Sequence, residues 1–224
     1  MTGSIVTHLI RKDLRLHRLQ ILLTMAAGLV ALAILRQTGE VPFVLGSTWF
    51  FVAIIVLGSM LPVATIVNER KKQTLTFLMS LPLSSMQYTT AKLVSTLLMF
   101  LAPWLGLLLS AVVLIATRNP ASFGIVPILL ILASLPVVGF SLILATALVS
   151  ESEGWAIAAT IICNSSYGLV YYLISRTPSL TVNWTGHVAV WNAAVLRFLS
   201  AEVGVVAVIV GVTFLLQSRK RDFI

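Results

Sequence analysis

The chain has 224 residues, of which 58% are hydrophobic and only 10% are charged, and its mean hydropathy is +1.03. Because a soluble domain carries roughly 25% charged residues, this composition excludes a soluble globular protein and indicates an integral membrane protein. The net charge is +8, but the basic residues flank apolar segments, so we expect anionic lipid and not nucleic acid as their partner.

Residues 1–18 have the pattern of an amphipathic helix. Basic side chains recur on one side at spacings of three and four residues, namely Arg11, Lys12, Arg15 and Arg18, while apolar residues take the other side. We expect a separate helix that lies flat on the inner membrane surface, with these four residues among the lipid headgroups. A disordered basic leader is the alternative.

Six segments are long and apolar enough to cross a hydrocarbon core about 30 Å thick. They are 19–35, 44–67, 93–117, 125–149, 155–174 and 198–216. We therefore predict an all-α membrane protein with six transmembrane helices and a single domain over residues 1–224. Glu202 is the one charged residue in these segments. We expect it to extend to the interface or to pair with an arginine; a proton-carrying role is the alternative.

The basic residues predict the orientation. Of the 15 Lys and Arg residues, eleven lie in the N-terminal segment, in residues 68–92 or in the C-terminal tail, and four lie in the opposite loops. Because cytoplasmic loops are enriched in Lys and Arg, we expect both termini in the cytoplasm. The expected location is a bacterial cell membrane.

Residues 68–92 form the only long polar break on the predicted cytoplasmic side. A charged run of Glu69, Arg70, Lys71 and Lys72 is followed by apolar residues at helical spacing, and Pro82 ends the pattern. We expect a short helix that presents an apolar side to a soluble partner. The alternative is an interfacial helix that only contacts lipid.

The predicted extracytoplasmic loop, residues 175–197, mixes Pro178, Gly186, Trp184 and Trp191 with apolar residues. Since Trp is enriched at membrane interfaces, we expect short interfacial or re-entrant helices before the last span.

Motifs for catalysis are missing from the sequence. There is no G-x-x-x-x-G-K-[ST], no His-Glu-x-x-His and no Cys-x-x-Cys. We therefore expect no catalytic residue, no metal site and no cofactor bound by this chain. The single cysteine, Cys163, lies among apolar residues and is expected to be a packing residue.

The fifth predicted span carries polar residues, which include Asn164, Ser165, Tyr167 and Tyr171. Because an amide in hydrocarbon needs a partner, Asn164 is expected to face the protein interior or a second helix. Two interpretations stay open: a polar translocation path, or hydrogen bonds between the helices of a dimer.

The segment 68–92 resembles the signature of ABC-2 type transporter permeases. The matching residues are Glu69-Arg70, Thr74, Leu78, the run Ser80-Leu81-Pro82-Leu83-Ser84, and Ala91-Lys92. The departure is Gln73, where the family pattern has glycine, so the local turn there is expected to differ.

The resemblance implies a half-transporter: two six-span subunits, identical or related, each seated on a separate ABC ATPase subunit that binds ATP and Mg. The implied ATPase contacts are Glu69, Arg70, Lys71, Lys72, Thr74, Leu75, Phe77, Leu78, Met79, Leu81 and Pro82. The implied function is export of a hydrophobic or amphipathic substrate such as a peptide, a lipid-linked compound or a drug. The alternative is a six-span scaffold or assembly factor that recruits a soluble partner without transport.

Overall fold

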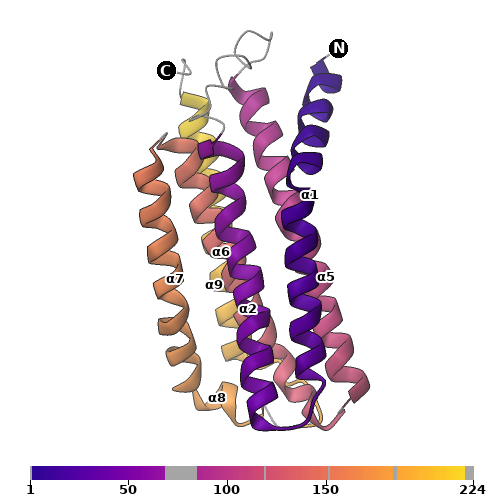
Figure 1. Ribbon diagram of the computed structural model, residues 1–224. Coiled ribbons are helices and arrows are strands. Elements are labelled where there is room, and N and C mark those ends of the chain that lie inside the picture. The colour runs from indigo at the N-terminus through magenta and orange to yellow at the C-terminus, as the bar shows by residue number, and fades with distance from the viewer. Residues whose placement is uncertain (1, 69–84, 119, 151, 184–185, 220–224) are drawn as a thin grey trace.

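The computed structural model describes residues 2–68, 85–118, 120–150, 152–183 and 186–219. These residues form long antiparallel helices and a few short turns, with no strand among them (Figure 1). The elements are α1 (Thr2–Leu35), α2 (Glu40–Pro62), the π-helical turn η1 (Val63–Val67), α5 (Ser85–Arg118), the 3₁₀ turn η2 (Pro120–Ile125), α6 (Val126–Val149), α7 (Glu153–Ser175), α8 (Pro178–Thr181) and α9 (Ala193–Arg219).

Six of the described helical segments are long and apolar enough to cross a membrane, which confirms the predicted number. They are Thr7–Leu35, Glu40–Val67, Thr90–Thr117, Phe123–Val149, Glu153–Ser175 and Ala193–Ser218. The beginning of α1 and the end of α9 lie at the same end of the bundle, as an even number of crossings requires (Figure 1). The end of η1 and the beginning of α5 lie there as well.

The prediction of a separate N-terminal helix over residues 1–18 is not confirmed. Residues 2–35 form one continuous helix of 34 residues, about 51 Å long at 1.5 Å per residue. Leu9, Asp13 and His17 recur at a spacing of four and are buried, so this half of α1 packs along the bundle instead of lying flat. The four basic residues Arg11, Lys12, Arg15 and Arg18 are exposed on its other sides.

A tight turn joins α1 to α2. Gly39 precedes α2 with a φ of 130°, a conformation that residues with a Cβ rarely adopt. Gly46 permits close approach of the two helices, because a Cβ at this position would lie 2.9 Å from the backbone nitrogen of Leu35 and 3.0 Å from the carbonyl oxygen of Ala31. Gly39 therefore permits the turn between α1 and α2, and Gly46 permits their close packing.

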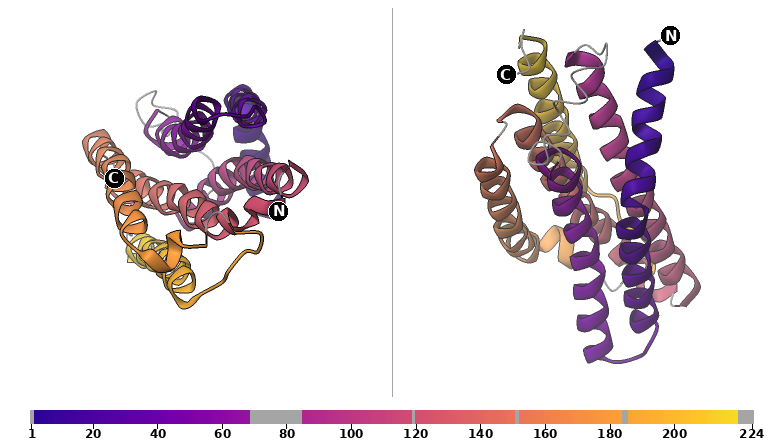
Figure 2. Two further views of the ribbon diagram at one scale, coloured as in Figure 1. Left: turned by 90° about the horizontal axis from the view of Figure 1, so that it is seen from below. Right: turned by 45° about the horizontal axis from the view of Figure 1, so that its top comes forward.

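The centre of the bundle is packed with apolar side chains. The rings of Phe100 in α5 and Phe140 in α6 stack with centroids 4.3 Å apart and planes 13° apart. Phe50 and Leu57 of α2 belong to the same buried cluster. Seen along the bundle, α6 lies between α2 and α5 on one side and α7 and α9 on the other (Figure 2), and it contacts all four of these helices.

A short helix precedes the last span, as expected. It is α8, a single turn in which Leu180 is buried beside Ile174 and Val195. Asn192 links it to α9: its side-chain nitrogen donates to the carbonyl of Ser179 at 2.5 Å, and its side-chain oxygen accepts from the amide of Val195 at 3.0 Å. The second bond caps the beginning of α9.

Candidate functional site

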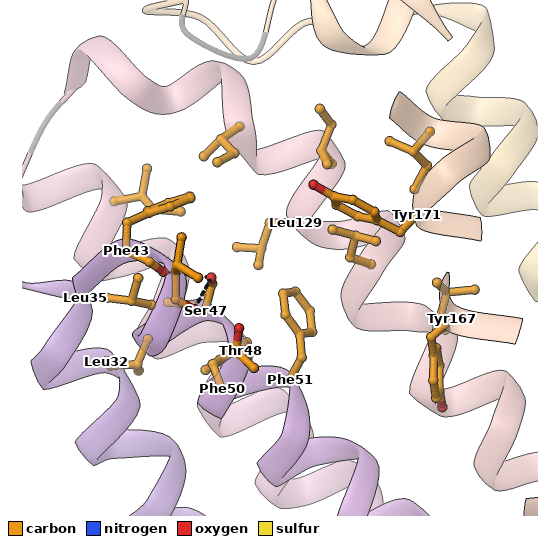
Figure 3. Close-up of a pocket in the computed structure, with 18 of the residues that line it drawn as sticks. Leu32, Leu35, Phe43, Ser47, Thr48, Phe50, Phe51, Leu129, Tyr167 and Tyr171 are labelled. Atoms are coloured by element: carbon orange, nitrogen blue, oxygen red, sulfur yellow. Dashed lines mark hydrogen bonds between the residues drawn. The ribbon is translucent and has the colours of Figure 1, made fainter. Parts of the chain in front are cut away.

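A cavity of about 700 Å³ lies at the end of the bundle opposite the termini. Residues of α2, α6 and α7 form most of its wall, and α1 and α5 close it on one side (Figure 3). We call it the α2–α7 cavity. Its size falls within the roughly 300–1,000 Å³ of ordinary small-ligand pockets.

The α2–α7 cavity has a buried floor and an exposed rim. Phe50, Ile128 and Ile174 line the floor and are almost completely buried. Phe43 of α2 and Tyr171 of α7 stand at the rim, where their side chains are 51% and 56% exposed. Figure 3 shows Tyr171 and Phe43 on opposite sides of the cavity. The cavity therefore opens on the flank of the bundle, between α2 and α7.

Two of the five hydroxyl-bearing side chains on the cavity wall, those of Ser47 and Ser175, are bonded within their own helices; Thr48, Tyr167 and Tyr171 carry the others. The hydroxyl of Ser47 donates to the carbonyl oxygens of Phe43 and Val44, at 2.7 and 3.2 Å. The hydroxyl of Ser175 donates to the carbonyl of Tyr172 at 2.7 Å. Most of the remaining lining residues are aliphatic or aromatic, so the cavity suits an apolar ligand group.

The polar residues that were predicted to line a translocation path lie in two different places in the structure. Tyr167 and Tyr171 line the α2–α7 cavity. Asn164 and Ser165 are exposed on the surface of α7 and lie outside the cavity lining. The cavity therefore unites only the two tyrosines, while the amide stays on the outside of this subunit.

A second polar site lies at the end of the bundle that carries the termini. Lys92 Nζ of α5 lies 2.9 Å from Asp13 Oδ2 of α1, and each side chain is only 2% exposed. The hydroxyl of Ser95 donates to the same carboxylate oxygen at 3.0 Å. Lys92 was expected in the cytoplasmic loop, but it lies inside α5. The ion pair, together with the hydrogen bond from Ser95 to Asp13, offsets the free-energy cost of burying the two charges.

This buried cluster also reaches the end of α2. The hydroxyls of Thr65 in η1 and Thr96 in α5 lie 3.4 Å apart, and that of Thr96 donates to the carbonyl of Lys92 at 2.7 Å. Both threonines are almost fully buried. The Asp13–Lys92 cluster, which we define as Asp13, Lys92, Ser95, Thr96 and Thr65, thus joins the three helical segments α1, η1 and α5.

The predicted ATPase contacts, Glu69 to Pro82, lie outside the described residues. Their flanks are described: η1 and Asn68 precede them, and α5 begins at Ser85 and follows them. The Asp13–Lys92 cluster contacts both flanks, through Thr65 before the segment and through Lys92 after it. It is therefore placed at the base of the segment.

Glu202 of α9 is buried and has no arginine partner among the described side chains, contrary to expectation. It is 9% exposed, and one of its carboxylate oxygens is bonded to the hydroxyl of Ser134 in α6. Its other oxygen has no hydrogen-bond partner among the described residues. The reason is helix packing: α9 lies along α6 at this level, so the carboxyl faces a helix instead of lipid.

Among the described residues, no group of His, Cys, Asp and Glu side chains could hold a metal ion. The thiol of Cys163 is buried and lies 3.8 Å from the carbonyl of Gly139 in α6. Its role as a packing residue between α7 and α6 agrees with its apolar surroundings.

Two features of these sites escaped the sequence analysis. Asp13 stands alone in a basic segment, and its spacing of four from Leu9 and His17 was the signal that it belongs to the packed side of α1. Phe43, Ser47 and Thr48 line the α2–α7 cavity but have no distinctive motif. They line one cavity only because α2 faces other helices across it. The sequence of α2 alone does not reveal which helices those are.

Comparison with known proteins identifies one family. A family model described as ABC-2 family transporter protein matches residues 8–217, which include all of α2 to α8, residues 69–84 and most of α1 and α9. No curated protein matches the chain. No solved structure matches it either.

Proposed function

Since this chain belongs to the ABC-2 family of transporter proteins, we propose that it is the membrane-spanning half of an ATP-driven exporter. The observation that carries the proposal is the extent of the family match, which covers the six spans and the segment between η1 and α5 together. In this proposal the chain is a multi-pass membrane component without catalytic activity of its own. A separate ABC ATPase binds ATP and Mg.

We assign the ATPase contact to residues 69–82, with Phe77 and Leu78 at its centre. An apolar side that fills a cleft supplies binding energy, and flanking charges such as Arg70 orient the contact. The segment is tied directly to α5. A displacement of it would therefore act on α5 and, through the buried ion pair between Lys92 and Asp13, on α1.

The substrate in this proposal is hydrophobic or amphipathic. The α2–α7 cavity supports this class, because most of its wall is apolar and its tyrosine and threonine hydroxyls would suit the polar part of an amphipathic molecule. A second six-span subunit, a copy of this chain or a relative, completes the transporter. The exposed amide of Asn164 on α7 is where that subunit would contribute a hydrogen-bond partner.

We place both termini in the cytoplasm of a bacterium. Ten basic residues remain on that side once Lys92, which is buried in α5, is removed from the eleven, and four lie on the other side. The asymmetry still favours the cytoplasmic location of the termini. The four exposed basic residues of α1 would face anionic headgroups there.

Affinity purification in mild detergent tests the ATPase contact. The chain is expected to retain a soluble ABC ATPase, and the substitution Leu78→Asp or Phe77→Asp is expected to abolish its recovery, because a buried charge opposes filling of an apolar cleft. The α-helical circular dichroism signal of the variant should stay unchanged, since the spans are not altered.

Leu16→Asp is a matched control, because Leu16 is an exposed leucine of α1 toward the same end of the bundle. This variant should retain the ATPase. Recovery of the ATPase with Leu78→Asp at the level of the unmodified chain would overturn the assignment. So would the absence of any ATPase from the purified unmodified protein when both are produced together.

A further inference from the structure

We propose that the α2–α7 cavity binds one acyl chain of an anionic membrane lipid, with the lipid headgroup held at Arg36 and Arg176. The proposal concerns this subunit alone and does not depend on an ATPase partner. It is supported by the depth of the cavity, the chemistry of its wall, the position of its mouth and the charges beside it.

The depth of the cavity matches one leaflet. Its lining residues in α2 run from Phe43 to Ile55, and those in α7 run from Tyr167 to Ser175. At 1.5 Å per residue these stretches extend about 18 Å and about 12 Å along their helices. Half of a hydrocarbon core is about 15 Å thick. The cavity is therefore as deep as the acyl region of a single leaflet, the one opposite the termini.

The interior of the cavity is mostly apolar. Buried apolar side chains such as Phe50, Ile128 and Ile174 form the floor, and the hydroxyls of Ser47 and Ser175 are bonded to backbone carbonyls of their own helices. The hydroxyls of Thr48, Tyr167 and Tyr171 also belong to the lining, but along most of the wall a peptide or sugar would lose its hydrogen bonds to water without replacement. A hydrocarbon chain makes no hydrogen bonds to water and therefore loses none when it enters the cavity.

The mouth of the cavity opens toward lipid. Its rim includes Phe43, Val44 and Tyr171, which are all more than half exposed. These residues belong to membrane-spanning helices, so their exposed faces contact the acyl chains of the surrounding bilayer. A lipid chain can enter sideways without leaving the hydrocarbon region.

Charges beside the mouth select an anionic headgroup. Arg36 directly follows the lining residue Leu35, and Arg176 directly follows the lining residue Ser175. Both are exposed, and the guanidinium of Arg176 lies 5.3 Å from the centre of the Tyr172 ring. Glu40 begins α2 at the same end and offsets one of these two charges. Two arginines against one glutamate leave a net positive charge at this end of the helices that line the cavity.

Photocrosslinking in lipid nanodiscs tests the proposal. The purified chain is reconstituted with phosphatidylglycerol that carries a diazirine in one acyl chain, or with phosphatidylcholine that carries the same chain. Phosphatidylglycerol is expected to label lining residues of α2 and α7 about fivefold more than phosphatidylcholine does, a difference of about 1 kcal/mol. Equal labelling of all lipid-facing helices by both lipids would overturn the proposal.

Cavity-filling variants give the second test. Ser47→Phe places a ring in the cavity and is expected to remove labelling of the lining residues. Ser200→Phe is the matched control, because Ser200 is exposed on α9, outside the cavity lining, and its hydroxyl also bonds a carbonyl of its own helix. If Ser47→Phe fails to fold, Thr48→Phe replaces it, because Thr48 lines the cavity and is exposed. Unchanged labelling in a folded filled variant would overturn the proposal.

The headgroup is tested with charge-neutral variants. Arg36→Gln combined with Arg176→Gln should reduce the preference for phosphatidylglycerol over phosphatidylcholine to near one. Arg197→Gln should leave it unchanged, because Arg197 lies near the same end of the bundle on α9, which lines no part of the cavity. Loss of the preference with Arg197→Gln, or its retention in the double variant, would overturn the role of Arg36 and Arg176. Each of these outcomes is independent of ATPase recovery.

Discussion

Lys92 Nζ and Asp13 Oδ2 lie 2.9 Å apart, although 79 residues separate them in the sequence and both side chains are buried. The pair joins α1 to α5 close to the point where the chain returns from residues 69–84. Buried ion pairs contribute little net stability compared with apolar residues, but removing one partner is costly. A buried pair at this position therefore specifies how α1 and α5 are held together.

We expect Asp13→Leu or Lys92→Met to lower the free energy of unfolding by about 3–5 kcal/mol, because each leaves one buried charge without its partner. The double variant Asp13→Leu with Lys92→Met should recover most of this loss. Thermal unfolding in detergent measures both effects. Arg15→Met, on the exposed side of α1, should stay within about 0.5 kcal/mol of the unmodified protein. If the loss of unfolding free energy in the double variant equalled the sum of the losses in the two single variants, direct coupling of the two residues would be contradicted.

Replacement of Glu202 tests the buried carboxyl beside Ser134. Glu202→Leu should leave stability unchanged or raise it by about 1–2 kcal/mol, because a carboxyl in hydrocarbon is costly and the Ser134 hydroxyl can still bond to Leu130 and Ile131 of its own helix. Glu202→Gln keeps a hydrogen-bonding partner for Ser134 and should change little. Unfolding of both variants in detergent is the measurement. Marked destabilisation by leucine would indicate a favourable contact of the carboxyl beyond Ser134.

Asn164 is exposed within a membrane-spanning helix, and a second subunit would supply its hydrogen-bond partner. We expect Asn164→Leu to weaken dimerisation about three- to tenfold, the effect of losing one interhelical hydrogen bond of about 1 kcal/mol in a membrane. Energy transfer between labelled subunits in vesicles reports the change. Val208→Leu on the exposed side of α9 should have no effect. An unaltered dimer with altered transport would instead support the translocation path.

Labelling with a membrane-impermeant maleimide tests the orientation. In a Cys163→Ser background, Val188→Cys should react in intact cells and Ser218→Cys should react only after permeabilisation. Both residues are exposed, and they lie near opposite ends of the bundle. The reversed pattern would place the termini outside the cell and would remove residues 69–82 from any cytoplasmic ATPase.

The number and approximate limits of the spans follow from the sequence alone. A hydrocarbon core requires about 20 apolar residues wherever a helix crosses it, so each span is a local property of the chain. Residues 125–149, for example, were predicted as a span, and the structure has a candidate span at Phe123–Val149. The family resemblance was equally local, because a short motif between the second and third spans carried it.

The sites depend on contacts between distant segments, which no local pattern reveals. The first span and the basic segment before it looked like two elements because their compositions differ, yet burial of Leu9, Asp13 and His17 makes them one helix. Lys92 was counted among the charges of the cytoplasmic loop, and its pairing with Asp13 exists only because α1 and α5 pack together. The α2–α7 cavity likewise exists only where Phe43 and Tyr171, which are 128 positions apart in the sequence, stand on opposite sides of one opening. Hydropathy is a property of each residue by itself, whereas a buried ion pair or a cavity is a property of two surfaces that the folded chain brings together.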